Sequence, residues 1–163
     1  KQHCLQFIWD PFAETAQTET ESLRISGTVK LSFDAAIDRE TAILSAMLVD
    51  LGEACRVTEE EIQHPDGTYT FGLEKEPSAY KVISRGWLNA QNRSCLWSKE
   101  KIVPGEFCHY AIDMVPTDHV LASGHKLALI LYGIDAEETQ RPDTVTNITV
   151  DTASIRAAVP MLR

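Results

Sequence analysis

The chain has 163 residues, of which 44% are hydrophobic and 24% are charged, and these shares argue against intrinsic disorder. Its net charge of −9 at pH 7 and its isoelectric point near 5.0 argue against nucleic acid or an anionic membrane as a partner, because both require clustered Lys and Arg. Length and composition therefore predict one globular domain over residues 1–163, of the kind found in acidic cytoplasmic proteins.

The cysteines, Cys4, Cys55, Cys95 and Cys108, are widely spaced and form no C-x-x-C pair. We expect reduced, mostly buried thiols in an intracellular protein. No signal peptide, lipidation motif or membrane-length apolar run is visible. Because the sequence begins at Lys1 within an apolar pattern, we expect a fragment of a larger protein.

Residues 4–12 carry more large hydrophobic side chains, Trp9 and Phe12 among them, than a free tail would. We predict that this segment docks on the body of the domain or on a neighbouring domain. Residues 23–34 alternate hydrophobic and polar side chains, which predicts a strand with one buried face. Residues 42–51 predict a second, more buried strand. The short link between these two strands predicts that they are antiparallel neighbours.

Residues 53–67 are highly charged and end in the tight-turn sequence His64-Pro-Asp-Gly, so they predict a surface excursion. Residues 68–73 and 80–88 predict two further strands, and Gly86 permits a bulge or a close backbone approach in the second one. Residues 89–101 predict a long, partly helical loop anchored by Leu96 and Trp97.

Residues 106–115 predict a strand whose buried face carries Tyr110 and Ile112. The unbroken apolar run at residues 127–132 is typical of a strand buried on both faces in the middle of a sheet. Residues 144–151 and 155–162 bring the total to about eight strands, with no period of helix length. This pattern predicts an all-β fold, a jelly-roll β-sandwich of two antiparallel sheets.

The sequence lacks the nucleophile elbow, the phosphate-binding loop and the zinc-protease motif. A catalytic triad would have to combine Ser84 or Ser123 with His125 and Asp135. A metal site would have to combine three dispersed histidines, His109, His119 and His125. Neither set has the spacing of a known motif, so we predict no catalytic residue, no metal ligand and no cofactor.

Two other ligand chemistries are compatible with side chains in the predicted loops. Carboxylates could bind calcium, although solvation of a loop is their commoner role: Asp113, Asp118, Asp135, Glu137 and Glu138. Aromatic rings could form a platform for a sugar, although packing is their commoner use: Trp87, Trp97, Tyr69 and Tyr80.

Several stretches resemble the C-terminal domain of the bacterial Xaa-Pro dipeptidyl-peptidases. They are Ser84-Arg-Gly-Trp-Leu-Asn-Ala-Gln-Asn-Arg, Pro104-Gly105 before a strand, and residues 116–142, which contain Gly124-His-Lys-Leu-Ala-Leu-Ile-Leu-Tyr. The resemblance covers roughly residues 23–160. It implies a non-catalytic, galactose-binding-domain-like jelly roll, because the triad of these serine peptidases lies in a separate α/β-hydrolase domain.

The resemblance also implies a parent enzyme that releases Xaa-Pro dipeptides from proline-containing peptides, in the bacterial cytoplasm and as a homodimer. This domain would pack on the α/β-hydrolase domain and shape access to its active site. The residues we expect at an interface or ligand platform are Trp9, Phe12, Arg85, Trp87 and Trp97. A carbohydrate-binding module of the galactose-binding type and the C-terminal domain of a related acyl-ester hydrolase stay open as alternatives.

Overall fold

The computed structural model describes residues 4–13, 22–135, 138–140 and 144–162. These parts contain twelve strands and one short 3-10 helix and no α-helix, so the all-β prediction is confirmed. No helix among them is long and apolar enough to cross a membrane. The elements are β1 (Cys4–Trp9), β2 (Leu23–Gly27), β3 (Lys30–Ile37), β4 (Ile43–Ala54), β5 (Val57–Gln63), β6 (Tyr69–Leu73), β7 (Ser78–Asn89), η1 (Ala90–Asn92), β8 (Phe107–Asp113), β9 (Thr117–Leu121), β10 (Lys126–Tyr132), β11 (Ile148–Ala158) and β12 (Met161–Leu162).

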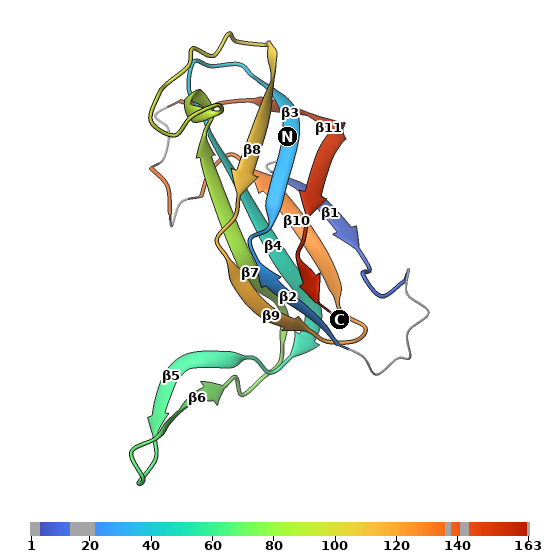
Figure 1. The fold of residues 1–163 in the computed structure, drawn as a ribbon, viewed down its shortest axis with the longest axis vertical. Helices are drawn as coiled ribbons and strands as arrows, with labels where there is room; N and C mark the ends of the chain where they lie inside the picture. The colour runs from blue at the N-terminus through green and yellow to red at the C-terminus, as the bar shows by residue number, and fades with distance from the viewer. Residues whose placement is uncertain (1–3, 14–21, 136–137, 141–143, 163) are drawn as a thin grey trace.

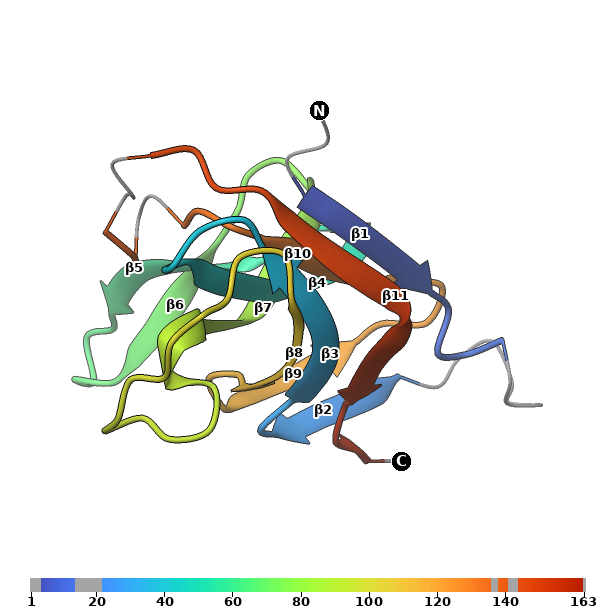
Figure 2. The same cartoon turned by 90° about the horizontal axis from the view of Figure 1, so that it is seen from above.

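All strand pairs are antiparallel. One layer is a four-stranded sheet in the order β1-β10-β4-β7, and it faces the three-stranded sheet β11-β3-β8 (Figures 1 and 2). Side chains from both layers, such as Phe33 and Tyr110 opposite Leu48 and Leu129, fill the core between them. The structure is therefore consistent with a β-sandwich, whereas the jelly-roll topology stays a prediction.

The second layer continues beyond a bend. Its lower half is the sheet β12-β2-β9, in which each strand directly follows or precedes its counterpart in β11-β3-β8 along the chain. Gly27 at the bend has a φ of +125°, and Pro116 and Pro160 lie at the same level in the other two strands. Proline has no N–H to donate to a ladder, so the sheet is interrupted there.

This bend corrects two predictions. Residues 23–34 form β2 and β3, which belong to the two halves of the bent layer and are not one strand. The predicted neighbours at residues 23–34 and 42–51 are also not paired, because the link after Ile37 crosses from one layer to the other. Strand β3 pairs with β8 and β11, and β4 pairs with β7 and β10.

The predicted central strand is confirmed. Strand β10 lies between β1 and β4, and Leu127, Ala128 and Leu129 are buried. The predicted close approach at Gly86 is also confirmed. A Cβ atom added there would lie 2.7 Å from Ile112 Cγ2 and 3.1 Å from Met114 Cα in the facing layer, so only glycine fits without a shift.

The charged residues after β4 form a β-hairpin that extends away from the sandwich (Figure 1). The predicted turn is confirmed, because Gly67 N donates to His64 O at 3.0 Å and Gly67 has a φ of +84°. Strand β5 was not predicted, because three consecutive glutamates interrupt its apolar alternation. Strand β9 was not predicted either, because it is short and polar.

The cysteines differ from the prediction in their burial. Cys4, Cys55 and Cys95 are exposed, and Cys108 is half-buried. All four are free thiols, as predicted. Three of them lie outside the core because they occupy the outer edge strand, the hairpin root and the loop after η1.

Candidate functional site

Asp135 is a buried carboxylate that accepts hydrogen bonds from at least three side chains, two of which are expected interface residues. It follows β10 and is 4% exposed. Its Oδ2 accepts hydrogen bonds from Tyr132 Oη at 2.7 Å, Trp87 Nε1 at 3.0 Å and Arg85 Nη1 at 3.2 Å. Burial raises the pKa of Tyr132, and the hydrogen bond to Asp135 raises it further. Arg85 and Trp87 thus lie together and fasten β7 to the segment after β10.

A shallow pocket of about 370 Å³ lies beside Arg85 and Trp87. Its remaining lining is mostly aliphatic and comes from β7 and from Val115. Ser84, one of the two serines considered for a triad, donates its hydroxyl to the Val115 carbonyl at 2.7 Å. This lining suits contact with an apolar side chain.

Trp9 and Phe12 are half-buried and pack against the core, so the predicted docking of the first segment on the body is confirmed. Trp9 and Phe7 also line an open groove of about 620 Å³ between β1 and β11. The groove is completed by Leu129, Thr152, Ile155, Ala157, Ala158, Val159 and Met161. These side chains are mainly apolar, and they lie at the outer edge of both layers.

The expected residues do not form one surface, because Trp9 and Phe12 lie at one edge of the four-stranded sheet and Arg85 and Trp87 lie on β7 at its other edge. Trp97 lies on a third part of the fold. It belongs to the loop after η1 and is 92% exposed, and its neighbour Leu96 is also exposed. The prediction that these two residues anchor the loop is wrong. The loop is held by Asn92 instead, whose amide Nδ2 donates to the carbonyls of Cys95, Leu96 and Ser98 at 3.1–3.3 Å.

The four aromatic residues considered as a sugar platform are not brought together. Tyr80 and Trp87 are seven residues apart on β7, which corresponds to roughly 23 Å in an extended strand. Tyr69 lies on the protruding hairpin and Trp97 on the loop after η1. The four rings thus belong to three separate parts of the fold: β6, β7 and the loop after η1.

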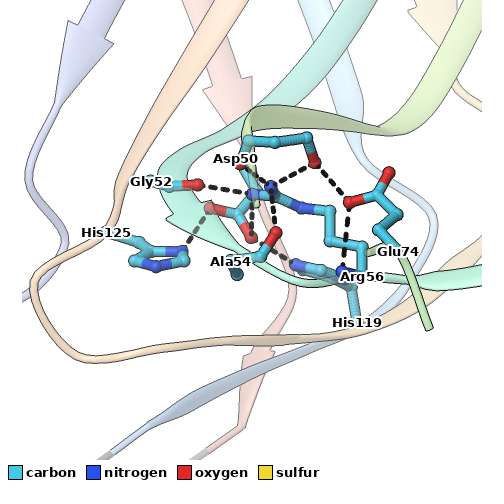
Figure 3. Close-up of polar contacts among 8 residues, drawn as sticks. Asp50, Gly52, Ala54, Arg56, Glu74, His119 and His125 are labelled. Atoms are coloured by element: carbon cyan, nitrogen blue, oxygen red, sulfur yellow. Dashed lines mark hydrogen bonds and ion pairs between the residues drawn. The ribbon is translucent and has the colours of Figure 1, made fainter. Parts of the chain in front are cut away.

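Asp50 is the second buried carboxylate and the centre of a polar cluster (Figure 3). It lies on β4 and is 3% exposed. His125 Nδ1 donates to its Oδ1 at 2.7 Å and His119 Nε2 donates to its Oδ2 at 2.9 Å, because a carboxylate can only accept. Arg56 Nη2 lies 3.7 Å from Asp50 Oδ2 and supplies the positive charge.

Arg56 also closes the root of the hairpin (Figure 3). Its guanidinium donates to the carbonyls of Gly52 at 2.8 Å and Ala54 at 3.4 Å, to Ser78 Oγ at 2.9 Å and to the Ser78 carbonyl. Glu74 Oε2 accepts from Ser78 Oγ at 2.8 Å and from the Arg56 amide at 3.1 Å, and these bonds lower the pKa of Glu74. The end of β4 and the start of β7 are thereby joined at one point.

The residues considered for a triad or a metal site are dispersed. His125 contacts Asp50 and not Asp135, and Ser84 is bonded to Val115. His109 binds Asp34 at 2.7 Å in the upper half of the bent layer, whereas His119 lies in its lower half and binds Asp50. In the part of the chain that is described, no three His, Cys, Asp or Glu side chains are arranged to hold a metal ion.

Asp113, Asp118 and Asp135, three of the carboxylates considered for calcium, are also dispersed. Asp118 binds Arg24 on the surface, with Oδ1 2.7 Å from Nε. Asp135 binds Arg85, and Asp113 lies at the end of β8. Glu137 lies outside the described residues.

The Asp50 cluster was missed in the sequence. One signal was present, because Asp50 is a carboxylate within the apolar run at residues 44–51 and a buried carboxylate needs partners. Its partners follow only from the fold, since His119 and His125 are 69 and 75 residues away along the chain.

Comparison with known proteins supports the resemblance found in the sequence. The family described as "X-Pro dipeptidyl-peptidase C-terminal non-catalytic domain" matches residues 11–161. The Xaa-Pro dipeptidyl-peptidase of Lacticaseibacillus rhamnosus is 32% identical over 148 residues, which cover 83% of this chain and 19% of that protein. The putative Xaa-Pro dipeptidyl-peptidase of Streptomyces avermitilis is 32% identical over 158 residues, which cover 86% and 23%. The chain therefore spans about a fifth of the length of these relatives.

Solved structures show the same fold at low identity. An α-amino acid ester hydrolase matches with a TM-score of 0.61 and 13% identity over 98% of this chain and 26% of that one. An aminopeptidase from a marine sediment Thaumarchaeota archaeon matches with a TM-score of 0.55 and 15% identity over 82% and 18%. The family match over residues 11–161 and the 32% identity to a curated relative lead to one conclusion: the chain belongs to the family of C-terminal non-catalytic domains of X-Pro dipeptidyl-peptidases.

Proposed function

We propose that this domain packs on the α/β-hydrolase domain of a serine-type Xaa-Pro dipeptidyl-peptidase and helps to wall the route to its active site. The observation that carries the proposal is the match to a C-terminal non-catalytic domain over residues 11–161, within relatives about five times as long. The catalytic groups then belong to the remainder of the parent, which would release Xaa-Pro dipeptides from the N-termini of proline-containing peptides.

The groove between β1 and β11 supports this proposal. It is open, mainly apolar and lined by Phe7 and Trp9 from one layer and by Ile155 and Val159 from the other. Covering such a surface with another protein is favourable, by roughly 25 cal/mol for each Å² of apolar area removed from water. Trp97 offers a second apolar contact, because its side chain is exposed.

The test is complementation of a truncated parent. The parent peptidase lacking this domain is assayed for release of the chromophore from a Gly-Pro anilide, alone and after addition of residues 1–163. We expect residues 1–163 to be inert alone and to restore activity or thermal stability to the truncated parent.

A matched variant makes this test specific. Ile155→Arg places a charge in the groove, and Val145→Arg places the same charge at an exposed position outside it. We expect Ile155→Arg to lower the restored activity at least tenfold and Val145→Arg to leave it unchanged. If the truncated parent is fully active and stable without this domain, the proposal is wrong.

A further inference from the structure

The hairpin β5–β6, residues 57–73, carries a row of exposed hydrophobic side chains, and we call it the arm. Tyr69, Phe71 and Leu73 alternate along β6 and so point to the same face. Val57 lies opposite Leu73 in the register, which places it on that face as well. The exposed fractions of these four side chains lie between 56% and 64%.

Such a face is unfavourable in water. The arm is a two-stranded ribbon that extends from the sandwich (Figure 1), and among the described strands each of its two strands pairs only with the other. An isolated two-stranded ribbon is at best marginally stable. A contiguous row of large, exposed apolar side chains bordered by polar residues is typical of an interaction site. The arm therefore has the properties of a docking element.

The root of the arm fixes its direction. Arg56 joins the carbonyls of Gly52 and Ala54 to Ser78, and Glu74 joins Ser78 to the Arg56 amide. These bonds hold the arm at a set angle to the sandwich before any partner binds. A pre-organised element loses less conformational entropy on docking than a free loop.

The charge of the arm selects its partner. Residues 57–73 contain four carboxylates, Glu59, Glu60, Glu61 and Asp66, and neither Lys nor Arg. Glu61 lies opposite Phe71 in the register and so lies on the same face, beside the apolar side chains. Pairing with the arm of a second copy would bring like charges together, which is unfavourable. The complementary surface is an apolar groove bordered by Lys or Arg.

The size of the face indicates where that groove lies. Four side chains are far fewer than the roughly 20–30 residues that each partner contributes to a stable association between separate proteins. A contact of this size is sufficient when a linker holds the two surfaces at high effective concentration. About four fifths of the length of the relatives lies outside this chain, so a tethered partner surface is available.

We propose that the arm docks through Val57, Tyr69, Phe71 and Leu73 into a basic-bordered apolar groove on the catalytic domain of the same polypeptide. The proposal rests on the packing of the two domains proposed above and adds the contact surface and the chemistry of its partner. Glu61 would pair with a Lys or Arg at the border of the groove.

Hydrogen exchange of the full-length parent peptidase tests this proposal. We expect the amides of β5 and β6 to exchange at least tenfold more slowly in the wild type than in Phe71→Asp, because that variant cannot bury the apolar face. Glu61→Lys should also accelerate exchange, and added salt should do so in the wild type. Val145→Asp, which alters a still more exposed residue outside the arm, should exchange as the wild type does.

Two outcomes would overturn the proposal. Equal exchange of the arm in the wild type and in Phe71→Asp would show that the arm is not docked. Protection that increases with protein concentration would identify a second copy as the partner. If either result appears while residues 1–163 still restore the truncated parent, domain packing stands and only the role of the arm is wrong. If complementation fails as well, the packing proposal is wrong too.

Discussion

His125 and Asp50 are hydrogen-bonded, Nδ1 to Oδ1 at 2.7 Å, although 75 residues separate them along the chain. His119 binds the other carboxylate oxygen at 2.9 Å. One carboxylate on β4 therefore joins β9 and the turn before β10, and Arg56 connects the same point to the root of the arm.

Removal of the Asp50 carboxylate should be strongly destabilising. In Asp50→Ala, Arg56 loses its buried counter-charge and both histidines lose their acceptor, so we expect the free energy of unfolding to fall by about 3 kcal/mol. Urea denaturation followed by circular dichroism measures this change. The control is Asp118→Ala, which removes an exposed ion pair with Arg24 and should have little effect. Equal midpoints for the two variants would contradict the prediction.

Gly52→Ala should act through the same cluster. A Cβ atom at this position would overlap the imidazole ring of His125, so the ring must move away from Asp50. We expect a loss of about 2 kcal/mol in the free energy of unfolding. In the Asp50→Ala background the same substitution should cost much less, because the hydrogen bond it disrupts is already absent. Additive losses in this double-mutant cycle would show that Gly52 has a different role.

Acid should loosen the root of the arm. The Ser78 hydroxyl and the Arg56 amide hold the pKa of Glu74 below its usual value of 4.5. A carboxylate whose pKa is depressed by folding contributes stability that is fully present above its unfolded pKa and lost as the pH falls through its folded pKa. We therefore expect nuclear magnetic resonance order parameters of β5 and β6 to be unchanged from pH 7 to pH 5 and to fall below about pH 4.

A variant of Ser78 tests the cause of that pKa shift. Ser78→Ala removes the larger of the two interactions, so the pKa of Glu74 should move upward toward its usual value. A carboxyl titration by nuclear magnetic resonance measures it directly. Ser98→Ala, which alters a serine that does not contact Glu74, serves as the control. A pKa unaffected by Ser78→Ala would rule out the hydroxyl as the cause.

Trp97 should be dispensable for folding and accessible in this domain. Because its side chain is 92% exposed, Trp97→Phe should change the free energy of unfolding by less than about 0.5 kcal/mol. It should also remove most of the tryptophan fluorescence that acrylamide quenches, since Trp9 and Trp87 are partly buried. If quenching persists in Trp97→Phe, the exposed indole belongs to another tryptophan.

Local patterns in the sequence were sufficient for most strands. The apolar run at residues 127–132 predicted a central strand, and β10 has that position. The alternation at residues 23–34 predicted the buried faces of β2 and β3 but not the bend between them. The bend depends on the φ of Gly27 and on prolines at the same level in two other strands, and these three strands are distant in the sequence. Strand β5 was not predicted, because three glutamates interrupt its pattern and its apolar residues face solvent instead of the core.

By itself the sequence determined the all-β class, the turn at His64 to Gly67 and, through its motifs, the family resemblance, because these depend on side-chain periodicity, turn chemistry and local identity. Only the tertiary structure decided that Asp50 gathers His119, His125 and Arg56, and that Trp87 and Arg85 share Asp135. These clusters join residues that are far apart along the chain. The pairing of these charged groups depends on how the sheets pair and face each other. It therefore cannot be inferred from residues that are neighbours in the sequence.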